Sequence, residues 1–145
     1  MKINIDTMTC DDITLIEPNF SENFDEFWSI DILKNDFENN NSKYIVAKYE
    51  NQIIGFAGIK IILDEAEIMN IAVRIDKRNL KIGSLLLEKL IDIAISSKCE
   101  LINLEVNEKN LPAIHLYEKY GFERIGFRKK YYNNTDDAIL MKRKI

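Results

Sequence analysis

Apolar residues along the chain follow two spacings, and each spacing predicts its own kind of element. Apolar runs that alternate with polar residues or are rich in β-branched residues predict about seven strands, at residues 2–6, 44–49, 52–62, 67–73, 101–106, 124–132 and 138–144. Apolar residues three or four positions apart predict about four helices, at residues 9–17, 25–38, 82–97 and 111–120. This order of elements is typical of an α/β domain, in which helices cover both faces of a mixed sheet.

The segment from residue 67 to residue 106 reads as strand, helix, strand. Such a crossover joins two parallel strands and is right-handed by default. Ligands of these sheets lie beyond the carboxyl ends of the parallel strands. The two strands end at Val73 and Val106, and we therefore expect the functional site near these residues.

A basic loop, residues 74–84, leads from the first parallel strand into the long helix. The N-terminus of a helix offers free N–H groups and the positive end of its dipole, so this loop is a candidate anion site. Gly83 would allow close backbone approach. One glycine is a weak signal, and a solvated basic loop with a glycine cap is the alternative.

The second parallel strand alternates, with Leu104 and Val106 on one face and Glu105 on the other. A glutamate near the carboxyl end of a strand is a candidate general base, and a solvated carboxylate is the alternative. Tyr117 lies on the next helix and is either a site residue or a core aromatic with a satisfied hydroxyl. The only histidine, His115, lies about 200° around that helix from Tyr117, so we expect it to have no chemical role.

Composition narrows the class of protein. A chain of 145 residues predicts one domain, residues 1–145. The 20 basic and 24 acidic residues give a net charge of −4, which argues against a general nucleic-acid-binding protein.

Cys10 and Cys99 lack the spacing of zinc or dithiol sites, and we expect two reduced thiols and no metal. No apolar run approaches the ~18 residues of a membrane span, and we expect a cytoplasmic protein that binds no membrane.

Two stretches resemble the GNAT (Gcn5-related) N-acetyltransferases: LDEAEIMNIAVRIDKRNLKIGS at residues 63–84, and LEVNEKNLPAIHLYEKYGFERIGFRKKYYNNTDDAILMK at residues 104–142. Within that family the chain is similar to the RimI-type ribosomal-protein-alanine N-acetyltransferases, over roughly residues 42–142. The resemblance implies a mixed sheet whose two central parallel strands splay apart, with acetyl-CoA in the gap.

The resemblance also assigns roles to individual residues. The cofactor-binding residues it implies are Ile71, Ala72 and Val73 for the pantetheine arm, Arg78, Asn79, Leu80, Lys81, Ile82, Gly83 and Ser84 for the pyrophosphate, and Asn110 in the loop after the second parallel strand. It makes Glu105 the general base and Tyr117 the general acid. The residues it implies on the substrate side are Phe27, Trp28, Tyr131 and Tyr132.

The implied activity is transfer of an acetyl group from acetyl-CoA to the N-terminal alanine of a small-subunit ribosomal protein. Two alternatives stay open: acetylation of another amine, such as a polyamine, an antibiotic or a lysine, and a regulator that binds acetyl-CoA without turnover. Lys81 stands where the family usually has a glycine. Its side chain would either hinder the phosphate or supply charge to it. Glu26 and Phe27 stand where relatives often have Phe-Pro, which bears on peptide specificity.

Overall fold

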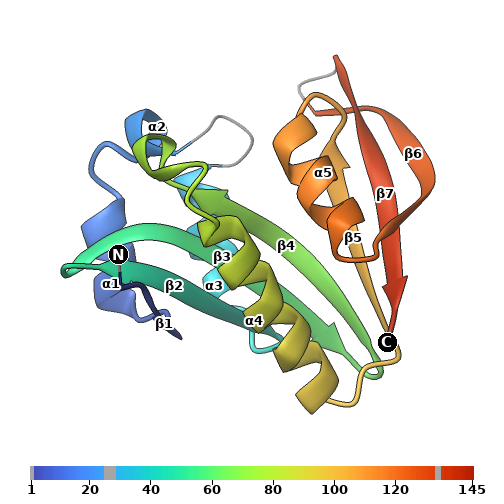
Figure 1. Ribbon diagram of the computed structural model, residues 1–145, viewed down its shortest axis with the longest axis horizontal. Coiled ribbons are helices and arrows are strands. Elements are labelled where there is room, and N and C mark those ends of the chain that lie inside the picture. The colour runs from blue at the N-terminus through green and yellow to red at the C-terminus, as the bar shows by residue number, and fades with distance from the viewer. Residues whose placement is uncertain (1, 25–28, 133–134) are drawn as a thin grey trace.

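The computed structural model describes residues 2–24, 29–132 and 135–145, without the side chains of residues 130–132 (Figure 1). Its strands are β1 Asn4–Thr7, β2 Ser42–Tyr49, β3 Gln52–Ile62, β4 Glu65–Val73, β5 Leu101–Asn107, β6 Glu123–Tyr132 and β7 Asp136–Lys144. Its helices are α1 Cys10–Ile16, α2 Phe20–Asn23, α3 Ile30–Phe37, the 3-10 turn η1 Ile75–Lys77, α4 Ile82–Ser96 and α5 Leu111–Lys119. The seven strands form one mixed sheet in the order β1-β2-β3-β4-β5-β7-β6, which confirms the predicted α/β fold class.

Local sequence signals account for most of the element boundaries. Thr9 caps α1, because its side chain accepts from the N–H of Asp12 and the Asp12 carboxylate accepts from the N–H of Thr9. Glu50 and Asn51 both have positive φ, as a two-residue hairpin between β2 and β3 requires. Gly121 ends the α5 region at φ 89°, a conformation that favours glycine.

Two helical regions differ from the sequence-based expectation. The helix expected at residues 25–38 begins at Ile30, because Ser29 has extended backbone and caps the helix by accepting from the N–H of Ile32; residues 25–28 lie outside the described part. The four-residue helix α2 was not predicted. It is too short to show a helical apolar period, and it begins after Asn19 at φ 60°.

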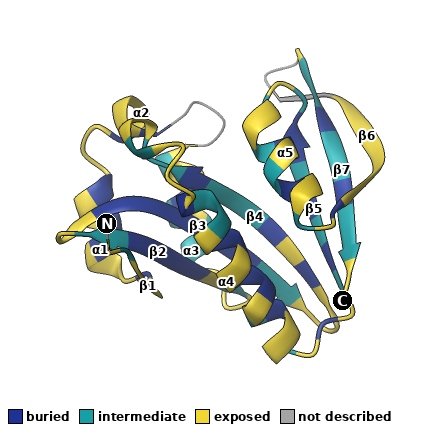
Figure 2. Cartoon of the chain, viewed as in Figure 1, coloured by how far each residue is buried: buried dark blue, intermediate teal, exposed yellow. Residues whose placement is uncertain are grey.

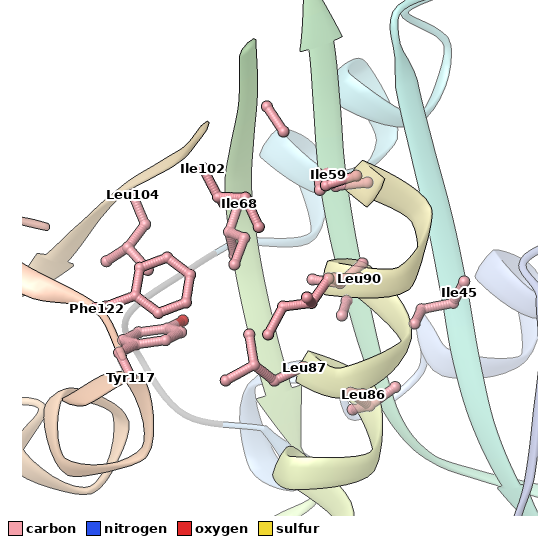
Figure 3. Packing of buried hydrophobic residues seen from close by; sticks show 14 of the residues in the cluster. Ile45, Ile59, Ile68, Leu86, Leu87, Leu90, Ile102, Leu104, Tyr117 and Phe122 are labelled. Atoms are coloured by element: carbon pink, nitrogen blue, oxygen red, sulfur yellow. The ribbon is translucent and has the colours of Figure 1, made fainter. Parts of the chain in front are cut away.

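Helices cover both faces of the first half of the sheet, which comprises β1 to β4 (Figure 1). On one face α4 packs through buried residues such as Leu86, Leu87 and Leu90 (Figure 3). On the other face Leu33 of α3 joins Phe20, Phe24 and other buried residues in a second cluster. Figure 2 shows β3 buried along most of its length and β6 largely exposed.

The two central parallel strands pair over only a short stretch. Residues 65–68 of β4 pair with residues 101–104 of β5. Beyond Ile68 and Leu104 the strands part, β4 staying on β3 as far as Val73 and β5 staying on β7 as far as Asn107. Figure 1 shows this divergence. A register shift between Gly58 and Ile59 also places a bulge in β4, next to the point where the strands separate.

Candidate active site

The free edge of β4 presents backbone groups to the space between the parting strands. The N–H of Arg74 donates to Ile54 O on β3 at 2.8 Å, and backbone direction alternates along a strand. The N–H and C=O groups of Ile71 and Val73 therefore face away from β3, toward β5. The N–H of Ile71 donates to Oδ1 of Asn70 at 2.8 Å. By the same alternation the backbone of Ala72 faces β3, with which it pairs at Phe56, and its side chain is buried in the core.

The basic loop wraps around the N-terminus of α4. Asn79 and Lys81 both adopt a left-handed conformation at φ 64°. Lys81 occupies the N-cap position of α4, and its side chain makes no capping hydrogen bond. The loop therefore has the backbone shape of a glycine-rich turn although it carries side chains. Arg78, Asn79, Leu80 and Lys81 are exposed.

Gly83 and Ile82 contribute to packing at the start of α4. A Cβ atom on Gly83 would lie 3.3 Å from Cδ2 of Leu116, so the glycine lets α4 approach α5. The side chain of Ile82 is buried in the core. Within residues 82–84, the backbone N–H groups at the helix N-terminus are thus what a phosphate could bind.

Glu105 projects from β5 on the face opposite Leu104 and Val106, which are both buried. Its side chain is 24% exposed, and Oε1 accepts a hydrogen bond from Nη2 of Arg128 at 2.8 Å. Arg128 lies on β6, on the far side of β7 from β5. The candidate base therefore carries a cationic partner that the sequence analysis did not identify.

Glu105 belongs to a group of charged side chains on this face of the sheet. Glu67 of β4 pairs in register with Lys60 of β3. Its partial removal from water raises the pKa of Glu67, and the negative charge of Glu105 raises it further. Asp36 of α3 acts in the same direction, whereas Lys60 and Arg128 act in the opposite one. Asp36 also forms an ion pair with Lys60 at 3.3 Å.

Tyr117 lies on α5 and is 4% exposed. Its ring packs edge-to-face on Phe122, with ring centroids 5.7 Å apart. Figure 3 shows its hydroxyl oxygen pointing away from α5 toward the side of β4 and α4. Tyr117 belongs to the same buried cluster as Leu104. Tyr117 and Glu105 thus flank β5 from its two faces, in the region where β4 separates from it.

The loop after β5 is fixed by a polar cluster that the sequence analysis missed. Asn107 is buried and donates through Nδ2 to Oδ2 of Asp136 at 3.1 Å, while its Oδ1 accepts from the N–H of Lys109. Hydrogen bonds from Lys109 and Asn107 hold the pKa of Asp136 below its usual range. Asn110 caps α5, its Oδ1 accepting from the N–H of Ala113 at 3.4 Å. The sequence does contain a signal for this cluster, because the polar residue Asn107 directly follows the alternating apolar residues of β5.

Three further expectations concern the histidine, the two cysteines and the residues on the substrate side. His115 is exposed, as predicted. Cys10 and Cys99 are both free thiols, and burial raises the pKa of Cys99, which makes it a poor nucleophile. Phe27 and Trp28 lie outside the described residues, and the side chains of Tyr131 and Tyr132 do so too.

The described residues contain few features of other kinds of site. No group of three or more His, Cys, Asp or Glu residues among them is arranged to hold a metal ion. None of the helices in residues 2–24, 29–132 and 135–145 is long and apolar enough to cross a membrane. A cavity of about 650 Å³ between β1, β2 and α4 contains none of the predicted site residues.

Comparison with known proteins agrees with this architecture. A 42% identical relative over 120 residues, covering 79% of this chain and 80% of its own, is the [ribosomal protein bS18]-alanine N-acetyltransferase of Haemophilus influenzae. The crystal structure of the Escherichia coli ribosomal-protein-S18-alanine N-acetyltransferase has a TM-score of 0.88 at 28% identity, covering 99% of this chain and 94% of that one.

A second solved structure is similar in fold. It is a GNAT family acetyltransferase from Elizabethkingia anophelis with acetyl-CoA bound, with a TM-score of 0.76 at 24% identity. The alignment covers 99% of this chain and 98% of that one. The model of the acetyltransferase (GNAT) family matches residues 11–122. This chain belongs to the GNAT acetyltransferase family.

Proposed function

We propose that this protein transfers an acetyl group from acetyl-CoA to the α-amine of a protein, and that its substrate is the N-terminal alanine of ribosomal protein bS18. The observation that carries the proposal is the separation of β4 and β5 beyond Ile68 and Leu104, with Glu105 and Tyr117 on the two sides of β5. Membership of the GNAT family and the named activity of the H. influenzae relative support the reaction and the substrate.

The residues on the free edge of β4 fit an extended amide-containing chain. The outward N–H and C=O groups of Val73 and the outward C=O of Ile71 can pair with it in the way that one strand pairs with another, whereas the N–H of Ile71 donates to Asn70. The N-terminus of α4 lies beyond this edge, where its N–H groups can hold a diphosphate. Acetyl-CoA supplies the acetyl group as a thioester, and its pantetheine arm and pyrophosphate are chemically suited to these two places.

Glu105 and Tyr117 would handle the protons of the reaction. The lone pair of a neutral amine forms the new C–N bond to the acetyl carbon, and Glu105 accepts the proton that the nitrogen loses, directly or through a water molecule. The C–S bond breaks and its electron pair stays on sulfur. The Tyr117 hydroxyl donates a hydrogen bond to that sulfur. A phenol has a pKa near 10 and a thiol near 8.5, so the proton moves late or in concert.

The chemistry of the amine favours an N-terminal substrate over lysine. An α-amine has a pKa of about 7.7–8.0, against about 10.4 for a lysine side chain. At pH 7 roughly a tenth of an α-amine is neutral, while under about a thousandth of lysine is. The difference of about 2.5 pKa units corresponds to about 3.4 kcal/mol. A carboxylate such as Glu105 therefore needs to supply less free energy to obtain a neutral α-amine than to obtain a neutral lysine side chain.

The test is an assay with acetyl-CoA and a peptide that carries the bS18 N-terminus. We expect one acetyl group on the α-nitrogen, located by fragmentation mass spectrometry, with one free thiol released per acetyl transferred. Two control substrates are the same peptide with a blocked α-amine and an added lysine, and a polyamine. Preference for either control would contradict the proposed substrate. Acetyl-CoA binding without thiol release on any of these amines would contradict the proposed enzymatic activity.

A further inference from the structure

We infer that Arg128 is a positioning residue that fixes the orientation of the Glu105 carboxylate. The inference rests on the proposed function, in which Glu105 accepts the proton of the amine. Arg128 touches no reacting atom in this scheme. Its effect on the reaction would pass through Glu105.

The geometry joins these two residues across the closing hairpin. Glu105 of β5 pairs with Leu140 of β7, and Arg128 of β6 pairs with Ala138, two residues earlier on β7. Residues two apart on a strand share a face, so both side chains lie on the same side of the sheet. The guanidinium reaches diagonally across β7, and its Nη2 lies 2.8 Å from Oε1 of Glu105.

This contact involves one defined oxygen of the carboxylate. A hydrogen bond from a charged donor is directional and stronger than a neutral one. Because Arg128 holds Oε1, the plane of the carboxylate is set by a group on another strand. The side chain of Glu105 is 24% exposed and that of Arg128 is 55% exposed, so the pair lies at the edge of the site and not in the core.

The neighbouring charges lie on the same face of the sheet. Glu67 on β4 lies close enough to interact with both Glu105 and Arg128, so two carboxylates and an arginine meet there. Asp36 and Lys60 also act on Glu67. Two carboxylates near one another repel, and a cation between them offsets the repulsion. Arg128 is hydrogen-bonded to Glu105 itself, so it holds that side chain in place beside Glu67.

A second arginine on the same strand offers a matched control. Nε of Arg124 lies 3.7 Å from Oε2 of Glu118, and both side chains are about half exposed. Exposed pairs of this kind contribute little to stability. Replacing Arg124 by glutamine thus removes one positive charge from β6 without altering the environment of Glu105.

The experiment compares Arg128→Gln, Arg128→Lys and Arg124→Gln by steady-state kinetics with the bS18 peptide, and by the carboxyl-carbon NMR chemical shift of Glu105 at one fixed pH. For Arg128→Gln we expect kcat to fall by about 10- to 100-fold, because a misplaced catalytic group is inefficient. The KM for acetyl-CoA should stay within about 2-fold, since β4 and α4 are untouched. The chemical shift of the Glu105 carboxyl carbon should move, because its charged hydrogen-bond donor is lost. Arg128→Lys should restore only part of kcat, because an ammonium lacks the planar fork.

The inference is wrong if Arg128→Gln behaves like Arg124→Gln, with kcat within about 2-fold of the wild type and the carboxyl-carbon chemical shift of Glu105 unmoved. It is also wrong if Arg128→Lys loses as much rate as Arg128→Gln while the chemical shift of Glu105 stays constant in both. The chemical shift is measured without turnover. A wild-type protein that fails to acetylate the peptide would therefore overturn the proposed function, while the chemical shift of Glu105 in the variants would still decide the role of Arg128.

Discussion

The two edges of β4 differ sharply in how they are paired. On one side β4 pairs with β3 from Glu65 to Val73, interrupted by one bulge, and helices cover both faces. On the other side it pairs with β5 over only four residues, up to Ile68. Exposed backbone N–H and C=O groups of a strand edge usually invite aggregation. Here the same groups lie beside the N-terminus of α4, where an extended ligand can pair with them. The half of the molecule from β1 to β4 is therefore built for stability, and the junction with β5 is suited to binding.

The largest effect that separates the two regions should come from the core under α4. Leu90 is fully buried in the first half of the molecule. Leu90→Ala should lower the free energy of unfolding by about 2–5 kcal/mol, because it removes buried methyl groups and leaves a cavity. Chemical denaturation measures this loss. At a temperature where the variant is folded, kcat should stay near the wild-type value. A large loss of kcat would contradict the assignment of stability to the half from β1 to β4 and of binding to the junction with β5.

Substitutions on either side of β5 should have the reverse effect, a loss of activity in a protein that keeps its fold. Glu105→Gln and Tyr117→Phe should each lower kcat by about 10²–10³-fold, since each removes a group that acts on charge developing in the transition state. The KM for acetyl-CoA should change little. His115→Ala is the matched control, because His115 is exposed on the same helix as Tyr117. Normal turnover in both variants, or a large loss in the histidine variant, would refute the assigned roles.

An intermediate effect on stability should appear at the N-terminus of α1. Burial tends to raise the pKa of Asp12, but hydrogen bonds from Thr9 and Lys48 outweigh it and hold the pKa below its usual value. The lowered pKa in the folded state contributes stability that is fully present above the unfolded pKa of about 4 and is lost as the pH falls from there through the lower folded pKa. Asp12→Ala should reduce the free energy of unfolding by about 1–2 kcal/mol at pH 7.

The same variant checks the pH dependence. The difference between the wild type and Asp12→Ala should shrink as urea unfolding is measured at successively lower pH, below about pH 4. Thr14→Ala is a suitable control, since Thr14 is exposed on the same helix. A difference between the two proteins that is independent of pH would contradict the role of the Asp12 charge.

The smallest expected effect concerns Lys81 in the loop before α4. Lys81→Gly should stabilise the fold by up to about 1 kcal/mol, because φ 64° suits glycine. It should also raise the KM for acetyl-CoA by up to about 5-fold at low salt, since it removes one exposed positive charge. The difference should vanish at high salt. Tighter binding of acetyl-CoA by the glycine variant would indicate that the side chain hinders the phosphate.

Much of this fold was readable from the sequence because its signals are local. Apolar spacing predicted all seven strands, and the capping pattern of Thr9 and Asp12 indicated the start of α1. The parting of β4 and β5 was expected only through the family resemblance, since nothing in apolar spacing records where two strands stop pairing. The sequence also singled out Glu105 and Tyr117 but not their surroundings.

The partners that fix those surroundings come from distant parts of the chain. Arg128 reaches Glu105 from 23 residues away, and Asp136 reaches Asn107 from 29 residues away. Neither pair has a characteristic spacing. The first exists because β7 lies between β5 and β6, and the second because β7 pairs with β5. Sequence spacing predicts elements, whereas contacts of this kind depend on the order in which strands are assembled.

The most direct test of the account is hydrogen exchange of the backbone amide of Val73, followed by NMR with and without acetyl-CoA. If the free edge of β4 binds the pantetheine arm, exchange at Val73 should slow on addition of acetyl-CoA. The amide of Ile71 already donates to Oδ1 of Asn70, and that of Arg74 to Ile54 on β3, so both should change less. Saturating acetyl-CoA that leaves Val73 unprotected while protecting another part of the chain would contradict the central claim.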